Sequence, residues 1–127
     1  MINFSQENKI FNLRPVDSEK AKKEIAEMLV AGEEIVDVFA TVRDQVIFTN
    51  KRIITVDVQG VGVKKDFVTI PYAKIQYFSV QTPGLVEIVH DNELQLFFSD
   101  GFVARFEFKG SYKIAKLAKV ISEYALQ

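Results

Sequence analysis

The stretch from Arg43 to Asp57, which reads RDQVIFTNKRIITVD, decides the fold of this chain. An apolar run at Val46–Phe48 leads into the polar pair Thr49-Asn50. After that pair, Ile54 and Val56 fall on one side of a second run. A polar turn between two runs rich in β-branched residues is typical of a β-hairpin. The stretch therefore predicts two paired strands at the centre of a β protein.

The same period of two recurs on both sides of this hairpin. The sequence predicts further strands over 34–42, 66–70, 74–80, 85–89, 93–98 and 102–108. Asp100-Gly101, between the last two, is a strong hairpin signal. Several short strands at close spacing predict a mainly β protein, either an antiparallel barrel or a sandwich.

Two segments have helical spacing instead. Over 18–30 the apolar positions Ala21, Ile25 and Leu29 form one stripe, which Gly32 ends. Over 111–126 a second stripe predicts a helix that closes one end of the barrel. We therefore expect one domain, with an N-terminal extension and helix (1–32), a β-barrel (33–109) and a capping helix (110–127).

Composition excludes several classes of site. The chain has 127 residues, no cysteine, one histidine and a net charge of −1. Disulfides, thiolate metal sites and histidine clusters are therefore excluded, and nothing indicates a nucleic-acid partner. The lone His90 has no nucleophile motif near it, so we expect no catalytic, cofactor or metal site. Neither a signal peptide nor an apolar span is visible, which predicts a cytoplasmic protein.

Two motifs carry a resemblance to a known family. The phrase FTNKRII (Phe48–Ile54), followed by IPYAKI (Ile70–Ile75), resembles the bacterial pleckstrin-homology-like family, once a domain of unknown function. The resemblance extends over about Glu34 to Tyr124, and the chain departs from the family at Gln81–Val89. It implies a barrel of about seven antiparallel strands capped by a C-terminal helix. It also implies a non-enzymatic module, with some members forming ring-shaped homo-oligomers, and implies no known ligand.

Basic residues near the central hairpin form one candidate site. Residues 43–74 hold six cations against three acids, a net charge of +3, whereas 81–100 hold four acids and no cation. An anion or lipid-headgroup site would use clustered cations. The candidates are Arg43, Lys51, Arg52, Lys64 and Lys65. The alternative is that these residues are solvated turn residues.

Apolar residues that alternation directs away from the barrel form the other candidate. These are Phe39, Phe97, Ile53 and Val103. Grouped apolar side chains on an outer face mark an interface. Two explanations are open: the helix over 18–30 covers them, or a second subunit does.

We therefore predict a non-catalytic binding or scaffolding module whose partner is itself, in a symmetric homo-oligomer that could be a ring. The first alternative is a peripheral binder of anionic lipid headgroups, with a membrane surface as its partner. A small enzyme is the second alternative, and it lacks a paired nucleophile and base.

Overall fold

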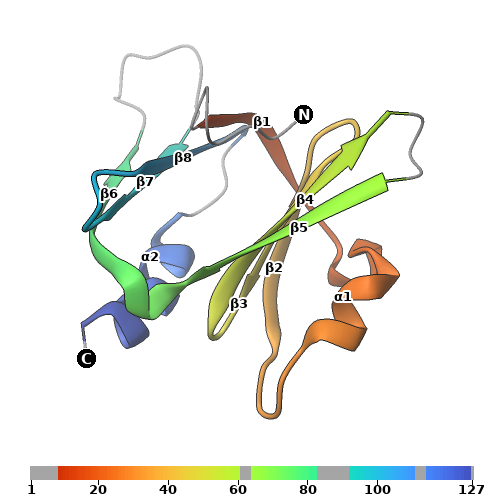
Figure 1. Cartoon of the computed structure of the whole chain (residues 1–127). Coiled ribbons are helices and arrows are strands. Elements are labelled where there is room, and N and C mark those ends of the chain that lie inside the picture. The colour runs from red at the N-terminus through yellow and green to blue at the C-terminus, as the bar shows by residue number, and fades with distance from the viewer. Residues whose placement is uncertain (1–8, 61–63, 83–91, 111–113, 127) are drawn as a thin grey trace.

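The computed structural model describes residues 9–60, 64–82, 92–110 and 114–126 (Figure 1). Most of the described residues lie in strands. The strands are β1 (Lys9–Val16), β2 (Ile35–Ala40), β3 (Gln45–Thr49), β4 (Arg52–Gln59), β5 (Lys64–Pro71), β6 (Ile75–Gln81), β7 (Asn92–Phe98) and β8 (Val103–Phe108). The helices are the 3-10 turns η1 (Ser18–Lys20) and η2 (Tyr72–Lys74), and the α-helices α1 (Lys23–Met28) and α2 (Ala115–Ala125).

The strands form one continuous bent sheet in the order β5-β4-β3-β2-β1-β8-β7-β6. The predicted hairpins are confirmed, with Ile47 opposite Ile54 in β3–β4 and Phe97 opposite Val103 in β7–β8. The predicted strand at 85–89 lies outside the described residues. The fold is therefore mainly β, as predicted.

Strand β1 joins the two halves of the sheet, and the sequence did not predict it. Its second part pairs antiparallel with β2, and its first part pairs parallel with β8. Between these parts Asn12 takes a positive φ of 59°, where the register shifts. The bend interrupts the alternation, so the segment has no period for a sequence pattern to detect. Part of the predicted N-terminal extension is thus a strand in the sheet.

The main core fills the concave side of the bent sheet. Its fully buried members include Phe48, Leu94, Leu96, Phe106 and Phe108. Helix α2 presses Leu117 and Ile121 into the same core, in agreement with the predicted stripe. In Figure 1 the helix lies beneath the sheet formed by β6, β7 and β8.

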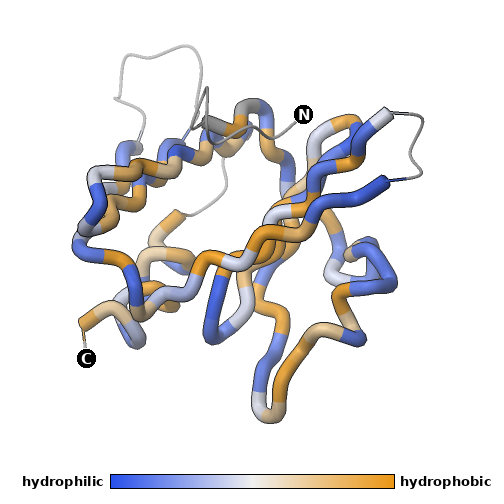
Figure 2. The backbone as a smooth tube through the Cα atoms, in the orientation of Figure 1, coloured by the Kyte–Doolittle hydropathy of each residue, from blue (hydrophilic) through white to orange (hydrophobic). Residues whose placement is uncertain are grey.

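A second apolar layer lies on the outer side of the β2–β5 half. Here Ile25 of α1 is buried with Val38, Ile54 and Val56, and Leu29 packs against them. We call residues 18–33, which form this layer, the cover segment. It lies on the far side of the molecule from α2 (Figure 1), and in Figure 2 hydrophobic colour runs along the strands between them.

The cover segment is less helical than predicted. Instead of one helix over 18–30, a 3-10 turn is followed by the six residues of α1. Between them Ala21 and Lys22 are extended, with ψ near 140°. Gln45 holds this break open, because its side-chain oxygen accepts from Lys22 N–H and its amide donates to Lys20 C=O. These bonds come from a distant strand, so local spacing could not predict the break.

Alternation also misassigned two residues. Phe39 and Ile53, predicted to face outward, are fully buried in the main core. Their neighbours Val38 and Ile54, predicted to face inward, lie in the outer layer under the cover segment. The prediction was wrong because these strands are buried on both faces, so both sets of alternate residues are apolar.

Candidate functional site

The predicted basic residues are dispersed, and Arg52 is held in a structural cluster. Its Nε lies 2.9 Å from the Glu33 carboxylate, and its Nη2 donates to Met28 C=O at 2.7 Å. A third bond runs from Nη1 to Thr69 Oγ1 at 3.2 Å. Arg52 therefore fastens the cover segment to β4 and β5, and its guanidinium is engaged on three sides.

Glu33 is the buried partner of Arg52, and we call this ion pair with its hydrogen bonds the clasp. Its side chain is fully buried, and it also accepts from Thr49 Oγ1 at 2.6 Å and from Val30 N–H at 3.0 Å. Burial alone would raise the pKa of Glu33. The bonds from Arg52, Thr49 and Val30 together outweigh burial and hold that pKa below its usual value.

Lys65 also fastens the cover segment to the sheet. Its ammonium lies 2.8 Å from the Glu24 carboxylate of α1, a contact that lowers the pKa of Glu24. Two of the five predicted anion ligands, Arg52 and Lys65, are thus already bonded to the cover segment.

The other three cations do not converge. Lys64 pairs with Gln59 at one end of β4, and Lys51 precedes the other end. At about 3.3 Å per residue, these two backbone positions are roughly 25 Å apart. Arg43 donates a hydrogen bond to Gly60 C=O near the Lys64 end. The five residues therefore do not form one basic site.

A groove does lie beside Arg43. It has a volume of about 550 Å³ between the η1 region and the β2–β3 loop. Lys20, Lys22 and Arg43 line it, together with Asp17 and Asp44. Three basic and two acidic residues thus line the groove, so its charges are mixed. The Asp44 carboxylate also accepts from Val58 N–H at 2.9 Å.

The remaining interface candidates, Phe97 and Val103, lie side by side on the outer face of β6, β7 and β8. They are directly opposite each other, and Tyr77 of β6 is opposite Phe97. The rings of Tyr77 and Phe97 stack at 4.4 Å with 7° between their planes. We call Tyr77, Phe97 and Val103 the apolar row.

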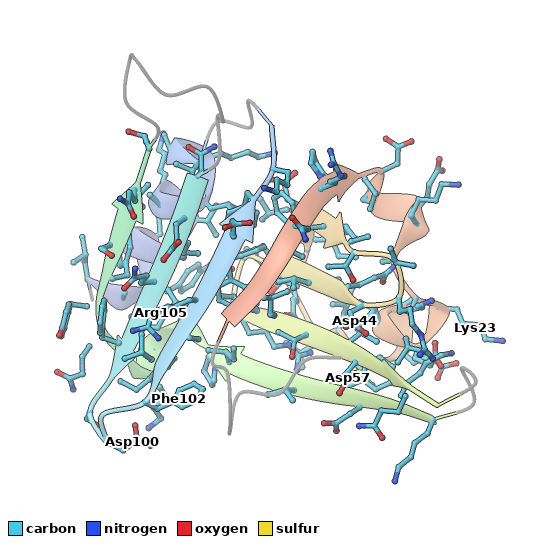
Figure 3. All side chains as sticks on the ribbon, turned by 90° about the horizontal axis from the view of Figure 1, so that it is seen from above. Lys23, Asp44, Asp57, Asp100, Phe102 and Arg105 are labelled. Carbon is cyan, nitrogen blue, oxygen red and sulfur yellow. The ribbon has the colours of Figure 1, made fainter. Side chains whose placement is uncertain are left out.

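The rest of this outer face is polar. The next row contains Ser79, Gln95 and Arg105, and the row after it contains Gln81, Glu93 and Glu107. Figure 3 looks down on this face, with Arg105 labelled on β8 and α2 behind the sheet. Among the described residues no helix covers it. We call it the uncovered face.

Tyr77 is the member of this site that sequence reasoning missed. It is 64 % exposed, although it lies in a strand. The signal was present, because β6 reads IQYFSVQ and contains no charged residue, proline or glycine. An edge strand without such residues is rare, since edges are normally protected from pairing with other chains.

Other classes of site find no support in the described residues. Within them, no three His, Asp or Glu side chains gather closely enough to hold a metal ion. His90 lies outside the described residues. No helix in the described part of the chain is long and apolar enough to cross a membrane.

A bent sheet of short strands, closed by a C-terminal helix over one core, defines a small domain of the pleckstrin-homology type. The chain matches the family described as "Bacterial PH domain" over residues 5–125. It belongs to this family, which confirms the resemblance carried by its two motifs.

Similar proteins agree with this assignment. The chain is 35 % identical over 114 residues to "Uncharacterized protein YjqA" of Bacillus subtilis (strain 168), covering 87 % of this chain and 90 % of that protein. A DUF1696 family structure with a pleckstrin-homology domain, from Shewanella loihica PV-4, superposes with a TM-score of 0.74 at 29 % identity, covering 90 % and 97 % of the two chains. A pleckstrin homology domain from Shewanella amazonensis SB2B gives 0.62 at 36 % identity, covering 88 % and 90 %.

Proposed function

We propose that this chain is a non-catalytic scaffolding module that assembles into a symmetric homo-oligomer through β6 and the uncovered face. The observation that carries the proposal is the exposed ring of Tyr77. Tyr77 lies in the uncharged edge strand β6, and its ring stacks on Phe97 of the neighbouring strand β7. Exposed apolar surface at an unprotected sheet edge is the usual mark of an association site.

The placement of the cations favours assembly over the lipid-headgroup alternative. Arg52 and Lys65 are committed to the cover segment, and Lys51 lies at the opposite end of β4 from Lys64. A headgroup site needs several cations to reach one anion. The apolar row, by contrast, is continuous across three strands.

Light scattering behind size exclusion, at two protein concentrations, tests the proposal. We expect a discrete multiple of the 14.5 kDa chain mass for the natural protein. Tyr77→Lys places a charge on the edge strand, where it opposes pairing with another chain. We expect this variant to elute as a folded chain of 14.5 kDa.

Val42→Lys is the matched control. Val42 is fully exposed in the β2–β3 loop, away from β6, so the same charge there should leave the assembly intact. A natural protein that is monomeric at both concentrations contradicts the proposal. So does a Tyr77→Lys variant that keeps the mass of the natural assembly.

A further inference from the structure

The other edge of the sheet, β5, is protected along only half its length. Its first half carries Lys64, Lys65 and Asp66, and its last residue is Pro71. Charges and proline are the usual means of blocking an edge. Between them, the segment Phe67–Ile70 carries neither.

The register shows which backbone groups this segment leaves open. Tyr72 N–H donates to Lys51 C=O, and hydrogen-bonded pairs alternate with non-bonded pairs along an antiparallel ladder. The pairs Ile53–Ile70 and Thr55–Val68 are therefore the bonded ones. The N–H and C=O groups of Phe67 and Thr69 consequently point away from β4, and no described strand pairs with them.

A slot of about 380 Å³ lies beside the same segment. Its apolar wall comes from Val68, Ile70 and Pro71 on one side and from Phe98 and Phe102 of the β7–β8 hairpin on the other. Figure 3 labels Phe102 at this hairpin, far from Lys23 of the cover segment. Val68 and Ile70 face the slot, so the inward side chain of a strand added to β5 would also enter it.

The charges at the slot define the occupant further. Lys74 lines the slot, and none of the described residues forms an ion pair with it. Asp100 lies on the opposite rim, where its Oδ1 accepts from Phe102 N–H at 3.0 Å, so the slot has one basic and one acidic rim. A carboxylate on the bound strand would complement Lys74. Strand β6 of a second copy carries no carboxylate, so it does not match. Strand β5 of a second copy carries Asp66, and the solution mass distinguishes that occupant from a partner peptide.

We propose that the Phe67–Ile70 edge and this slot bind an extended peptide segment of a partner protein, with a bulky apolar side chain and a carboxylate two residues away on the same face. The added strand bonds to the free groups of Phe67 and Thr69, which supplies affinity independent of sequence. The slot and Lys74 supply the specificity. This site is separate from β6 and goes beyond the self-assembly proposed above.

A blocked peptide of Thr and Val, with a central Phe and a Glu two residues away, is a suitable probe, because alternate side chains of a strand lie on one face. Titrated into the full chain labelled with ¹⁵N, it should shift the amides of Phe67, Thr69 and residues 99–102. The same peptide with Ala in place of Phe should have an affinity at least roughly tenfold lower, because the slot then stays empty. Equal affinities for the two peptides would refute the role of the slot.

Thr69→Pro removes the outward N–H, and Thr69→Val is its matched control. Both variants lose the hydroxyl that accepts from Arg52, but only the proline loses the edge donor. We expect Thr69→Pro to bind the probe more weakly than Thr69→Val. In Lys74→Glu, the preference should reverse toward a probe with Lys in place of Glu.

The proposal is overturned if millimolar peptide causes no shifts, if the shifts centre on β6, or if the two Thr69 variants bind the probe equally. A change in solution mass on Thr69→Pro also overturns it, since a second copy would then occupy this edge. A monomeric natural protein would refute the assembly proposal while leaving this one standing.

Discussion

The two halves of the sheet share one inner core but differ on their outer faces. The outer face of the β2–β5 half carries an apolar layer that includes Val38, Ile54 and Val56, and the cover segment buries it. The outer face of the β6–β8 half has one apolar row followed by two polar rows, and no described helix covers it.

This difference indicates that one outer face of the sheet stabilises the fold and that the other is open to a partner. The covered face is sealed by apolar packing and by two ion pairs, Glu33–Arg52 and Glu24–Lys65. Polar groups that fasten a segment in this way are unavailable to a ligand. The uncovered face leaves its aromatic pair open to a partner. Each prediction below therefore contrasts one face with the other.

The largest effect is expected from Arg52→Met on the covered face. The variant leaves the buried Glu33 carboxylate without its cation, which typically costs about 3–5 kcal/mol. Urea unfolding should show this loss as a lower transition midpoint. Arg105→Met makes the same exchange on the uncovered face and should change stability by less than about 0.5 kcal/mol.

A double variant separates two contributions to the loss of stability: the missing ion pair and the unpaired buried charge of Glu33. Glu33→Gln with Arg52→Met removes both charges, so it should be more stable than Arg52→Met alone. If Arg52→Met and Arg105→Met unfold at the same urea concentration, the clasp does not hold the cover segment as the geometry indicates.

An apolar truncation on each face gives the next largest effect. Ile25→Ala empties a fully buried position between α1 and the sheet, and such changes cost about 2–5 kcal/mol. Phe97→Ala removes a half-buried ring and should cost around 1 kcal/mol in the monomer. Equal losses, measured in the Tyr77→Lys background to exclude assembly, would show that the two faces are buried alike.

Sequence patterns predicted most of the fold because most strands show a local period of two, and because the turns at Thr49-Asn50 and Asp100-Gly101 have local turn signals. The β3–β4 and β7–β8 hairpins and the stripe of α2 followed directly from spacing. Strand β1 did not, because its bend at Asn12 and its two partners are set by tertiary contacts.

The candidate site was predictable only where one sheet face remains exposed. Alternation placed Phe97 and Val103 correctly on the outer face of β7 and β8, but failed at Phe39 and Ile53, where both faces are buried. Counting cations failed for a different reason. Arg52 and Lys65 pair with Glu33 and Glu24, and no sequence motif signals those contacts.

The smallest effect is the pH dependence of the covered face. The pKa of Glu33 is lower in the folded chain than its ordinary value in an unfolded chain. Between these two values the unfolded chain binds more protons, so stability rises with pH in that window. The contribution of Glu33 is complete above the unfolded pKa, and it is lost as pH falls through the folded one.

Protonation costs less than Arg52→Met because a neutral carboxyl still accepts hydrogen bonds, whereas the variant strands a buried charge. Urea midpoints at a series of pH values from neutral to acidic measure this contribution. Glu33→Gln should flatten the acid limb without abolishing it, because Glu24 also has a lowered pKa and keeps its bond to Lys65. An acid limb unchanged by Glu33→Gln would mean that the clasp contributes nothing to the acid sensitivity of the fold.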